Sequence, residues 1–119
     1  MKLIIAGSRS IKDPEHIIKA LERWPHLKDC TEVVSGLAAG PDTLGIMWAI
    51  CNGKKVVRFP AKWRENGNRA GIKRNNEMAR YGTDLLAIWD GESRGTRHMI
   101  VTAKRHGLNV YIYNVDKEK

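Results

Sequence analysis

Three stretches of the sequence combine glycine with hydroxyl or guanidinium side chains, and each follows an apolar run. They are Gly7-Ser8-Arg9-Ser10, Ser35-Gly36-Leu37-Ala38-Ala39-Gly40-Pro41-Asp42 and Trp89-Asp90-Gly91-Glu92-Ser93-Arg94-Gly95-Thr96. Small residues leave backbone N–H groups open to a ligand, and such a turn at the start of a helix binds anions. Arginine adds a fork of donors suited to phosphate. Together the stretches favour a phosphate site, although each alone is also typical of an ordinary strand-to-helix turn.

Positive charge is concentrated in residues 54–74. The whole sequence has a net charge of +8, and this segment, with eight Lys and Arg against the single acid Glu65, carries most of it. Clustered charge attracts anions, whereas most basic runs form only a solvated surface. Because the segment follows a predicted strand directly, we expect Arg74 and Asn75 to face an anionic ligand. Trp63 is expected either to stack on a base or to serve in packing.

These observations define one set of candidate ligand-binding residues. It consists of Gly7, Ser8, Arg9, Ser35, Gly36, Leu37, Ala38, Gly40, Asp42, Trp63, Arg74, Asn75, Asp90, Gly91, Ser93, Arg94, Gly95 and Thr96. Asp90 is placed either to accept a ribose hydroxyl or to form a turn. A catalytic carboxylate is not singled out by spacing, and the candidates for it are Asp42, Glu77 and Asp90.

Several other chemistries lack their motifs in this sequence. The absence of GxGxxG and GxxxxGK[ST] disfavours a standard dinucleotide fingerprint and a Walker loop. The four histidines form no HExxH or Cys/His cluster, so no metal site is expected. We therefore expect a ligand site that uses neither a metal nor a resident cofactor.

The turns and the basic segment must be positioned by an alternation of strands and helices. Continuous apolar runs rich in Val and Ile are typical of strands covered on both faces, as in a parallel sheet, while the alternating last run indicates an edge. The predicted strands are Lys2–Ala6, Glu32–Ser35, Lys55–Phe59, Asp84–Trp89 and Asn109–Asn114. Ligands of such sheets bind beyond the carboxyl ends of the strands, which is where the candidate residues lie.

Helix signals lie between these runs. Asp13-Pro14-Glu15 begins the first helix, and Asp42 is expected to cap the second. The third helix is predicted from about Arg69 to Tyr81, and the fourth from Gly95-Thr96 to Gly107. In the second helix the residues expected to face inward are Leu44, Met47, Trp48 and Cys51. The alternation predicts a doubly wound α/β sheet with right-handed crossovers.

Length and composition place these elements in one ordinary globular domain. The chain has 119 residues, with 42% hydrophobic and 29% charged, and we expect residues 1–119 to form a single domain. No apolar run approaches the length of a membrane span, and the one at the amino terminus is too short for a signal peptide. We therefore expect a cytoplasmic protein, with Cys30 and Cys51 as small buried apolar residues.

At these residues the chain resembles the Rossmann-like SLOG superfamily, which is named for the Smf/DprA and LOG proteins. Gly7-Ser8-Arg9, the Ser35–Asp42 loop (similar to SGxAxGxD) and Ser93-Arg94-Gly95-Thr96 (similar to SxGT) carry the resemblance. The small YspA-like branch, found in bacteria and phages, is the most similar. Its third-strand insertion of the form AxW, AG and RN matches Ala61 and Trp63, Ala70 and Gly71, and Arg74 and Asn75.

The resemblance implies a three-layer Rossmann-like sandwich, with a mostly parallel five-stranded sheet covered by helices on both faces, that binds a nucleotide-derived ligand. It also implies a homo-oligomer, either a dimer or a tetramer. LOG proteins cleave the N-glycosidic bond of nucleotides with a glutamate, but Met99 stands at the matching position and cannot act as a base. We therefore expect sensing or sequestration of a phosphorylated nucleoside derivative. The alternatives are an N-glycosidase-type enzyme and single-stranded DNA binding of the DprA type.

Overall fold

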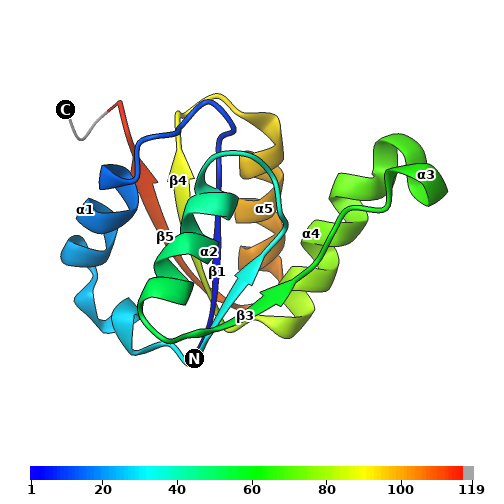
Figure 1. Ribbon diagram of the computed structural model, residues 1–119. Helices are drawn as coiled ribbons and strands as arrows, with labels where there is room; N and C mark the ends of the chain where they lie inside the picture. Colours follow the sequence, from blue (N-terminus) through cyan, green and yellow to red (C-terminus); the bar gives the residue numbers. More distant parts are fainter. Residues whose placement is uncertain (117–119) are drawn as a thin grey trace.

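The five predicted strands form one parallel sheet in the computed structural model, which describes residues 1–116. Their order across the sheet is β3-β2-β1-β4-β5 (Figure 1). The predicted α/β architecture is confirmed, and the alternating last strand lies at an edge as expected. The strands are β1 (Lys2–Gly7), β2 (Glu32–Ser35), β3 (Lys55–Arg58), β4 (Asp84–Trp89) and β5 (Asn109–Asn114).

Helices cover both faces of this sheet and complete a three-layer sandwich. One layer packs against Leu3 and Ile5 of β1, and the other packs against Ile4, because successive strand residues point to opposite faces. The first layer contains α1 (Glu15–Arg23), α2 (Pro41–Cys51) and the short 3₁₀ helix η1 (Pro25–Asp29). The second contains α4 (Ala70–Tyr81) and α5 (Arg94–Arg105). No helix among residues 1–116 combines the length and apolar character needed to cross a bilayer.

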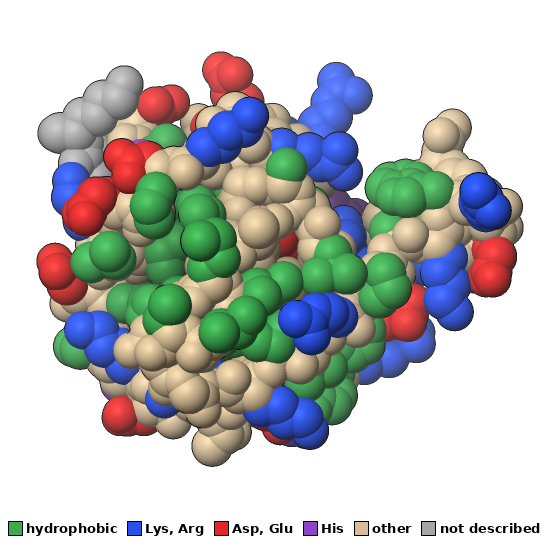
Figure 2. Space-filling model, viewed as in Figure 1, with side chains coloured by type: hydrophobic (Ala, Val, Ile, Leu, Met, Phe, Trp, Pro, Cys, Tyr) green, Lys and Arg blue, Asp and Glu red, His purple; other side chains and the backbone are tan. Residues whose placement is uncertain are grey.

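Helix α2 contacts the sheet through small residues as well as through Leu44 and Trp48, two of the four large residues that we predicted to face inward. Gly45 is buried, and a Cβ built on it would lie 2.9 Å from the Ile5 Cβ. The helix therefore lies close to β1 at this position. The prediction that Met47 and Cys51 face inward is wrong, since Met47 is 57% exposed and Cys51 is also exposed. Figure 2 shows hydrophobic side chains at the surface on this side of the molecule.

The connection from β3 to α4 extends away from the sheet. Residues 60–69, which we call the arm, contain the short helix α3 (Trp63–Asn66) and the 3₁₀ turn η2 (Gly67–Arg69). Neither has a buried side chain, and the arm projects from the body with basic side chains along it (Figures 1 and 2). No helix was predicted between the third strand and the third helix, so α3 is an element that was not foreseen from the sequence.

The strand order creates a topological switch between β1 and β4. The chain moves from β1 to β2 and β3 on one side, and then crosses to β4 on the other side of β1. The turn after β1 leads to α1 on one face, and the turn after β4 leads to α5 on the other. Turns that diverge in this way open a crevice at the carboxyl ends of the two strands.

Candidate functional site

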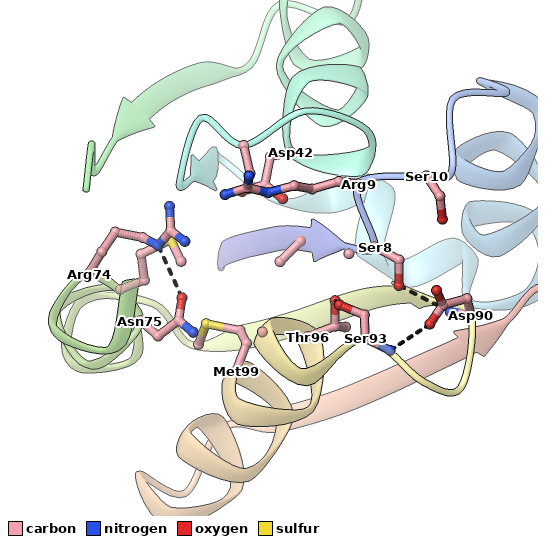
Figure 3. A pocket seen from close by; sticks show the side chains of 15 residues that line it. Ser8, Arg9, Ser10, Asp42, Arg74, Asn75, Asp90, Ser93, Thr96 and Met99 are labelled. Atoms are coloured by element: carbon pink, nitrogen blue, oxygen red, sulfur yellow. Dashed lines mark hydrogen bonds between the residues drawn. The ribbon is translucent and has the colours of Figure 1, made fainter. Parts of the chain in front are cut away.

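The crevice between the β1 and β4 turns is a cavity of about 460 Å³, which we call the main cleft (Figure 3). Its walls come from these two turns, from the loop between β2 and α2, and from the facing sides of α4 and α5. The predicted residues that line it are Gly7, Ser8, Arg9, Ala38, Asp42, Arg74, Asn75, Asp90, Ser93, Gly95 and Thr96. Segments far apart in sequence therefore meet at one place, as the positions after the strands predict.

The β1 turn is joined to the β4 turn by Ser8. Its side chain is buried, and its Oγ accepts a hydrogen bond from the Asp90 backbone N–H at 3.2 Å. The Ser8 backbone N–H donates to the Ile88 carbonyl at 3.0 Å. Ser8 thereby fixes the floor of the main cleft, while the neighbouring Arg9 extends over the cleft toward Asp42 (Figure 3). Arg9 is exposed, so its guanidinium can approach an anion from solvent.

Asp90 shapes the start of α5. Its carboxylate accepts hydrogen bonds from the backbone N–H groups of Glu92 and Ser93, both at 2.8 Å. These bonds, with a smaller contribution from the Ser8 hydroxyl, hold the pKa of Asp90 below its ordinary value. Asp90 is therefore an ionised turn-forming group at the edge of the cleft.

The first turn of α5 faces open space in the main cleft. A Cβ built on Gly95 would meet no atom within 4 Å, so its backbone is accessible to a ligand. The Thr96 hydroxyl donates to the Ser93 Oγ at 3.2 Å, which places two hydroxyl groups beside this helix start. Free N–H groups at a helix N-terminus carry partial positive charge and bind anions. The β4 turn and α5 together form a wall of the main cleft whose chemistry is suited to an anion.

The loop between β2 and α2 folds over Asp42, and the prediction that Asp42 caps α2 is wrong. Gly40 is the N-cap, with φ of 81°, and Asp42 occupies the first turn of the helix. Its Oδ2 instead accepts from the Gly36 backbone N–H at 3.2 Å. Ser35 Oγ closes the loop by donating to the Asp42 carbonyl at 3.0 Å and accepting from the Leu37 N–H at 3.2 Å. This packing holds the Asp42 carboxyl inside the protein, at the wall of the main cleft.

Asp42 is the acid with the most perturbed environment in the main cleft. The side chain is only 4% exposed, and this burial raises its pKa from 3.8 to about 6. The positive charge of Arg74 and the backbone N–H groups of Ala38, Gly36 and Gly7 oppose the rise but do not cancel it. A buried acid with a strongly shifted pKa in a cleft is a frequent feature of functional sites.

Arg74 crosses from α4 to the loop over Asp42. Its Nη1 donates to the Gly36 carbonyl at 2.6 Å, and its Nε donates to the Asn75 Oδ1 at 3.1 Å. Burial lowers the pKa of Arg74, the Asp42 charge raises it, and the neighbouring Arg9 lowers it further. The guanidinium groups of Arg9 and Arg74 therefore repel each other across the cleft, and Asp42, the acid nearest to Arg74, is largely buried. An anion placed between them would relieve their repulsion.

A second cavity of about 190 Å³, which we call the side cleft, adjoins the main cleft. The two share Arg9, Ala38 and Arg74, and the side cleft adds the predicted residues Gly36, Leu37 and Trp63. Trp63 projects from the arm and is 53% exposed, which leaves much of its ring available. The side cleft is therefore a place where a flat group could lie against an aromatic surface while remaining close to both arginines.

The remaining predicted residues lie outside both clefts. Ser35 and Gly40 shape the β2–α2 loop, while Gly91 and Arg94 line neither cavity. The catalytic candidate Glu77 lies on the outer side of α4, in a groove with Lys73, Asn76 and Arg80. The helical period explains this position, because Asn76, Glu77 and Arg80 follow Lys73 at intervals of three, four and seven residues and therefore share one face of α4.

Several residues that line the clefts were not predicted from the sequence. The main cleft also contains Ser10 and Met78, and the side cleft contains Pro60. Met78 lies one helical turn after Arg74, so the spacing of α4 could have indicated it. Met99 lines the main cleft and is buried. Its thioether cannot transfer a proton, which leaves Asp42 and Asp90 as the lining carboxyl groups.

Comparison with known proteins adds to this geometry. The model of the family described as "YspA, cpYpsA-related SLOG family" (YAcAr) matches residues 1–65. The "Gene 61 protein" of Mycobacterium phage D29 is 36% identical in an alignment 118 residues long, and the alignment covers 92% of this chain and 93% of that protein. No solved structure gives a significant match. The family match includes the β1 turn and the β2–α2 loop, and the similarity to the phage protein extends over nearly the whole chain.

Proposed function

The chain belongs to the YspA, cpYpsA-related SLOG family, and from this premise and the chemistry of the main cleft we propose that it binds a nucleotide or a related phosphorylated nucleoside. The phosphate lies between the guanidinium groups of Arg9 and Arg74 and the first turn of α5. The ligand is held for sensing or sequestration, and the residues lining the cleft supply the contacts.

The observation that carries the proposal is the convergence of anion-binding groups on one cavity. Arg9, Arg74, the accessible backbone at Gly95 and the hydroxyls of Ser93 and Thr96 line the same 460 Å³ space. Charge-assisted bonds from arginine and a helix N-terminus are the usual means of holding phosphate. The cavity also falls within the range of about 300–1,000 Å³ that is usual for small-molecule sites.

The two clefts offer different binding places for the ribose and the base of such a ligand. Asp42 and Asp90 offer carboxylate oxygens in the main cleft, where they can accept hydrogen bonds from ribose hydroxyls. Trp63 offers its ring in the side cleft, where it can stack on the base. Because Arg9 and Arg74 line both cavities, the phosphate and the base can be bound at the same time.

Calorimetric titration with matched ligands tests the proposal. We expect a nucleoside monophosphate or diphosphate to bind at least about tenfold more tightly than the nucleoside that lacks the phosphate, since each charge-assisted hydrogen bond contributes about 1.5–3 kcal/mol. Free phosphate and a single-stranded oligonucleotide complete the panel. Equal affinity for nucleoside and nucleotide would show that the phosphate site is misplaced, and tighter binding of the oligonucleotide would favour the nucleic-acid alternative.

Cleavage of the N-glycosidic bond is the second candidate, and the raised pKa of Asp42 favours it. An acid with a pKa of about 6 is suited to proton transfer near neutral pH. Against this, Met99 occupies the position at which the LOG enzymes that this chain resembles use a glutamate. Chromatography of the same ligands after incubation with the protein separates the candidates. Release of free base by wild type but not by Asp42→Asn would support the enzyme.

Replacing Trp63 with alanine is expected to weaken nucleotide binding about tenfold and to leave binding of inorganic phosphate unchanged. Stacking on an aromatic ring contributes about 1–3 kcal/mol per base, and phosphate alone has no ring to stack. Titration of both ligands into both proteins gives the comparison, with Trp63→Phe as the control that keeps an aromatic face. An equal loss for phosphate and nucleotide would mean that Trp63 only supports the arm.

A further inference from the structure

We propose that His98, which does not line either cleft, is a positioning residue that holds Arg74 in its binding orientation through Asn75, and that protonation of His98 releases Arg74 and weakens anion binding. The effect on affinity rests on the proposed function, because it requires that Arg74 contacts the anion. The positioning itself does not require a ligand, and it follows from the directions of the hydrogen bonds.

A chain of hydrogen bonds joins α5 to the loop over Asp42. His98 on α5 is bonded through Nδ1 to the Asn75 Nδ2 at 3.0 Å, and through Nε2 to the Thr102 Oγ1 at 3.4 Å. The Asn75 Oδ1 accepts from the Arg74 Nε at 3.1 Å, and Arg74 Nη1 donates to the Gly36 carbonyl at 2.6 Å. Asn75 is buried, so it cannot exchange these partners for water without a rearrangement.

The guanidinium of Arg74 determines which atom donates and which accepts in each of these hydrogen bonds. A guanidinium can only donate, so the atom of Asn75 that faces Arg74 must be its oxygen. The amide nitrogen of Asn75 then faces His98 and must donate to it. The His98 Nδ1 therefore accepts, which requires a neutral ring with its proton on Nε2, directed at Thr102. One arrangement of donors and acceptors satisfies the whole chain.

A proton on Nδ1 is incompatible with this arrangement. Protonated histidine donates from both ring nitrogens, so Nδ1–H would face the N–H₂ group of Asn75. If Asn75 turns its oxygen toward His98, its N–H₂ group meets the Arg74 Nε–H instead. Either way one pair of donors faces each other. When Asn75 turns to relieve the clash with His98, Arg74 loses the Asn75 Oδ1 contact that fixes its guanidinium between Asn75 and Gly36.

The surroundings of His98 favour its neutral form. Burial is the main cause that lowers the pKa of His98 below 6.5, and the charge of Arg105, further along α5, lowers it as well.

The elements packed around His98 present few charged groups to it. On α4, Arg74 reaches His98 through Asn75, whereas Lys73, Glu77 and Arg80 line the groove on the outer side. Tyr81, at the end of α4, is hydrogen-bonded to Glu32. Beneath α5, β1, β4 and β5 contribute Ile4, Ala6, Leu85, Ala87, Val110 and Ile112, which are all apolar.

The sign of the expected pH effect distinguishes this role from simple electrostatics. Added positive charge near an anion site normally tightens binding, and protonation of Asp42 would act in the same direction by removing a negative charge. Protonation of His98 is expected to do the opposite, because it displaces Arg74. The comparison of wild type with a variant that keeps the acceptor but cannot be protonated isolates this contribution.

Histidine ¹⁵N NMR tests the positioning without any ligand. At about pH 7.5 we expect His98 to be the tautomer with the proton on Nε2, and we expect the Arg74 Nε resonance to shift as His98 titrates. A His98 ring protonated on Nδ1 at that pH, or an Arg74 resonance that ignores the titration of His98, would overturn the proposal even if no anion were found to bind.

Titration of sulfate, which stays fully ionised in the pH range used, tests the effect on binding. His98→Gln offers an amide oxygen that can accept from Asn75, and it should match wild type at about pH 7.5 but bind about fivefold more tightly than wild type at about pH 5. His98→Leu should bind about fivefold more weakly than wild type at about pH 7.5.

His106→Gln, at the exposed end of α5, is the matched control. Parallel pH profiles for wild type and His98→Gln would overturn the proposal. Failure of sulfate to bind any of the proteins would instead count against the proposed function.

Discussion

Replacing both Arg9 and Arg74 with alanine is expected to weaken nucleotide binding roughly 1,000-fold, because each guanidinium supplies a charge-assisted bond of about 1.5–3 kcal/mol. The two side chains come from different elements, the β1 turn and α4, yet they line the same cavities. Each single variant should lose about 10- to 100-fold in affinity. Since the two groups act on one anion, the losses need not be additive.

The two arginines should differ in their effect on stability. Arg9 is exposed, so Arg9→Ala should leave the melting temperature nearly unchanged. Arg74 also holds the Gly36 carbonyl, and its removal should cost about 1 kcal/mol. The matched control is Arg80→Ala, which removes the same charge from the outer side of α4. Calorimetric titration and thermal melting of the three variants give both quantities, and a loss of affinity in Arg80→Ala equal to that in Arg9→Ala would show that only net charge matters.

Asp42 is expected to make the folded protein about 3 kcal/mol less stable above pH 6 than it is when this carboxyl is protonated. Its pKa is about 6 in the folded protein, against an ordinary value of 3.8. The folded state therefore binds the proton more tightly than the unfolded state. The contribution of this group to the free energy of unfolding should rise as the pH falls from about 6 to about 4, since each pKa unit corresponds to about 1.4 kcal/mol.

Urea unfolding of wild type and Asp42→Asn between about pH 7.5 and pH 4 measures this contribution. Other groups act in the opposite direction. Because the pKa of Asp90 is lowered in the folded protein, its contribution to the free energy of unfolding decreases as the pH falls. Subtracting the free energy of unfolding of Asp42→Asn from that of wild type at each pH removes the contributions that the two proteins share. That difference should move by about 3 kcal/mol in favour of wild type as the pH falls. A constant difference across the range would mean that Asp42 titrates normally.

The position of the site was predictable because of the parallel sheet. Continuous apolar runs such as Leu3–Ala6 indicated strands covered on both faces, and the carboxyl ends of parallel strands lie at one edge. Ser8, Asp42 and Thr96, which are far apart in the chain, could thus be placed together before the structure was known. The order of the elements along the chain was sufficient for this prediction, and the structure brings the three residues together in the main cleft.

The details that depend on side-chain packing were not predictable in the same way. Helix α2 is apolar on several sides, so its period did not reveal that Gly45 forms the contact with Ile5 and leaves Met47 outside. Asp42 followed a cap pattern, but Gly40 takes the cap and the carboxyl turns to Gly36. These outcomes depend on which atoms fit at short distances, and residue types do not carry that information.

The link between Asn75 and His98 joins two helices whose partners are 23 residues apart. No local spacing indicates such a pair, and each residue alone is ordinary for the surface of a helix. The pairing of Asn75 with His98 depends on how α4 packs against α5, which only the structure shows. The parts of the site that act through an intermediary are therefore the parts that the sequence conceals most completely.

The arm contributes Trp63 to the side cleft without contributing a side chain to either core. Mutations within it can accumulate during evolution with little penalty to folding, since α3 and η2 support nothing beneath them. Under the proposed function, exchanges within this segment alter which base is preferred, while the β1 turn, α4 and α5, which would hold the phosphate, stay constant. The proposed base preference and the folding of the domain can therefore evolve separately.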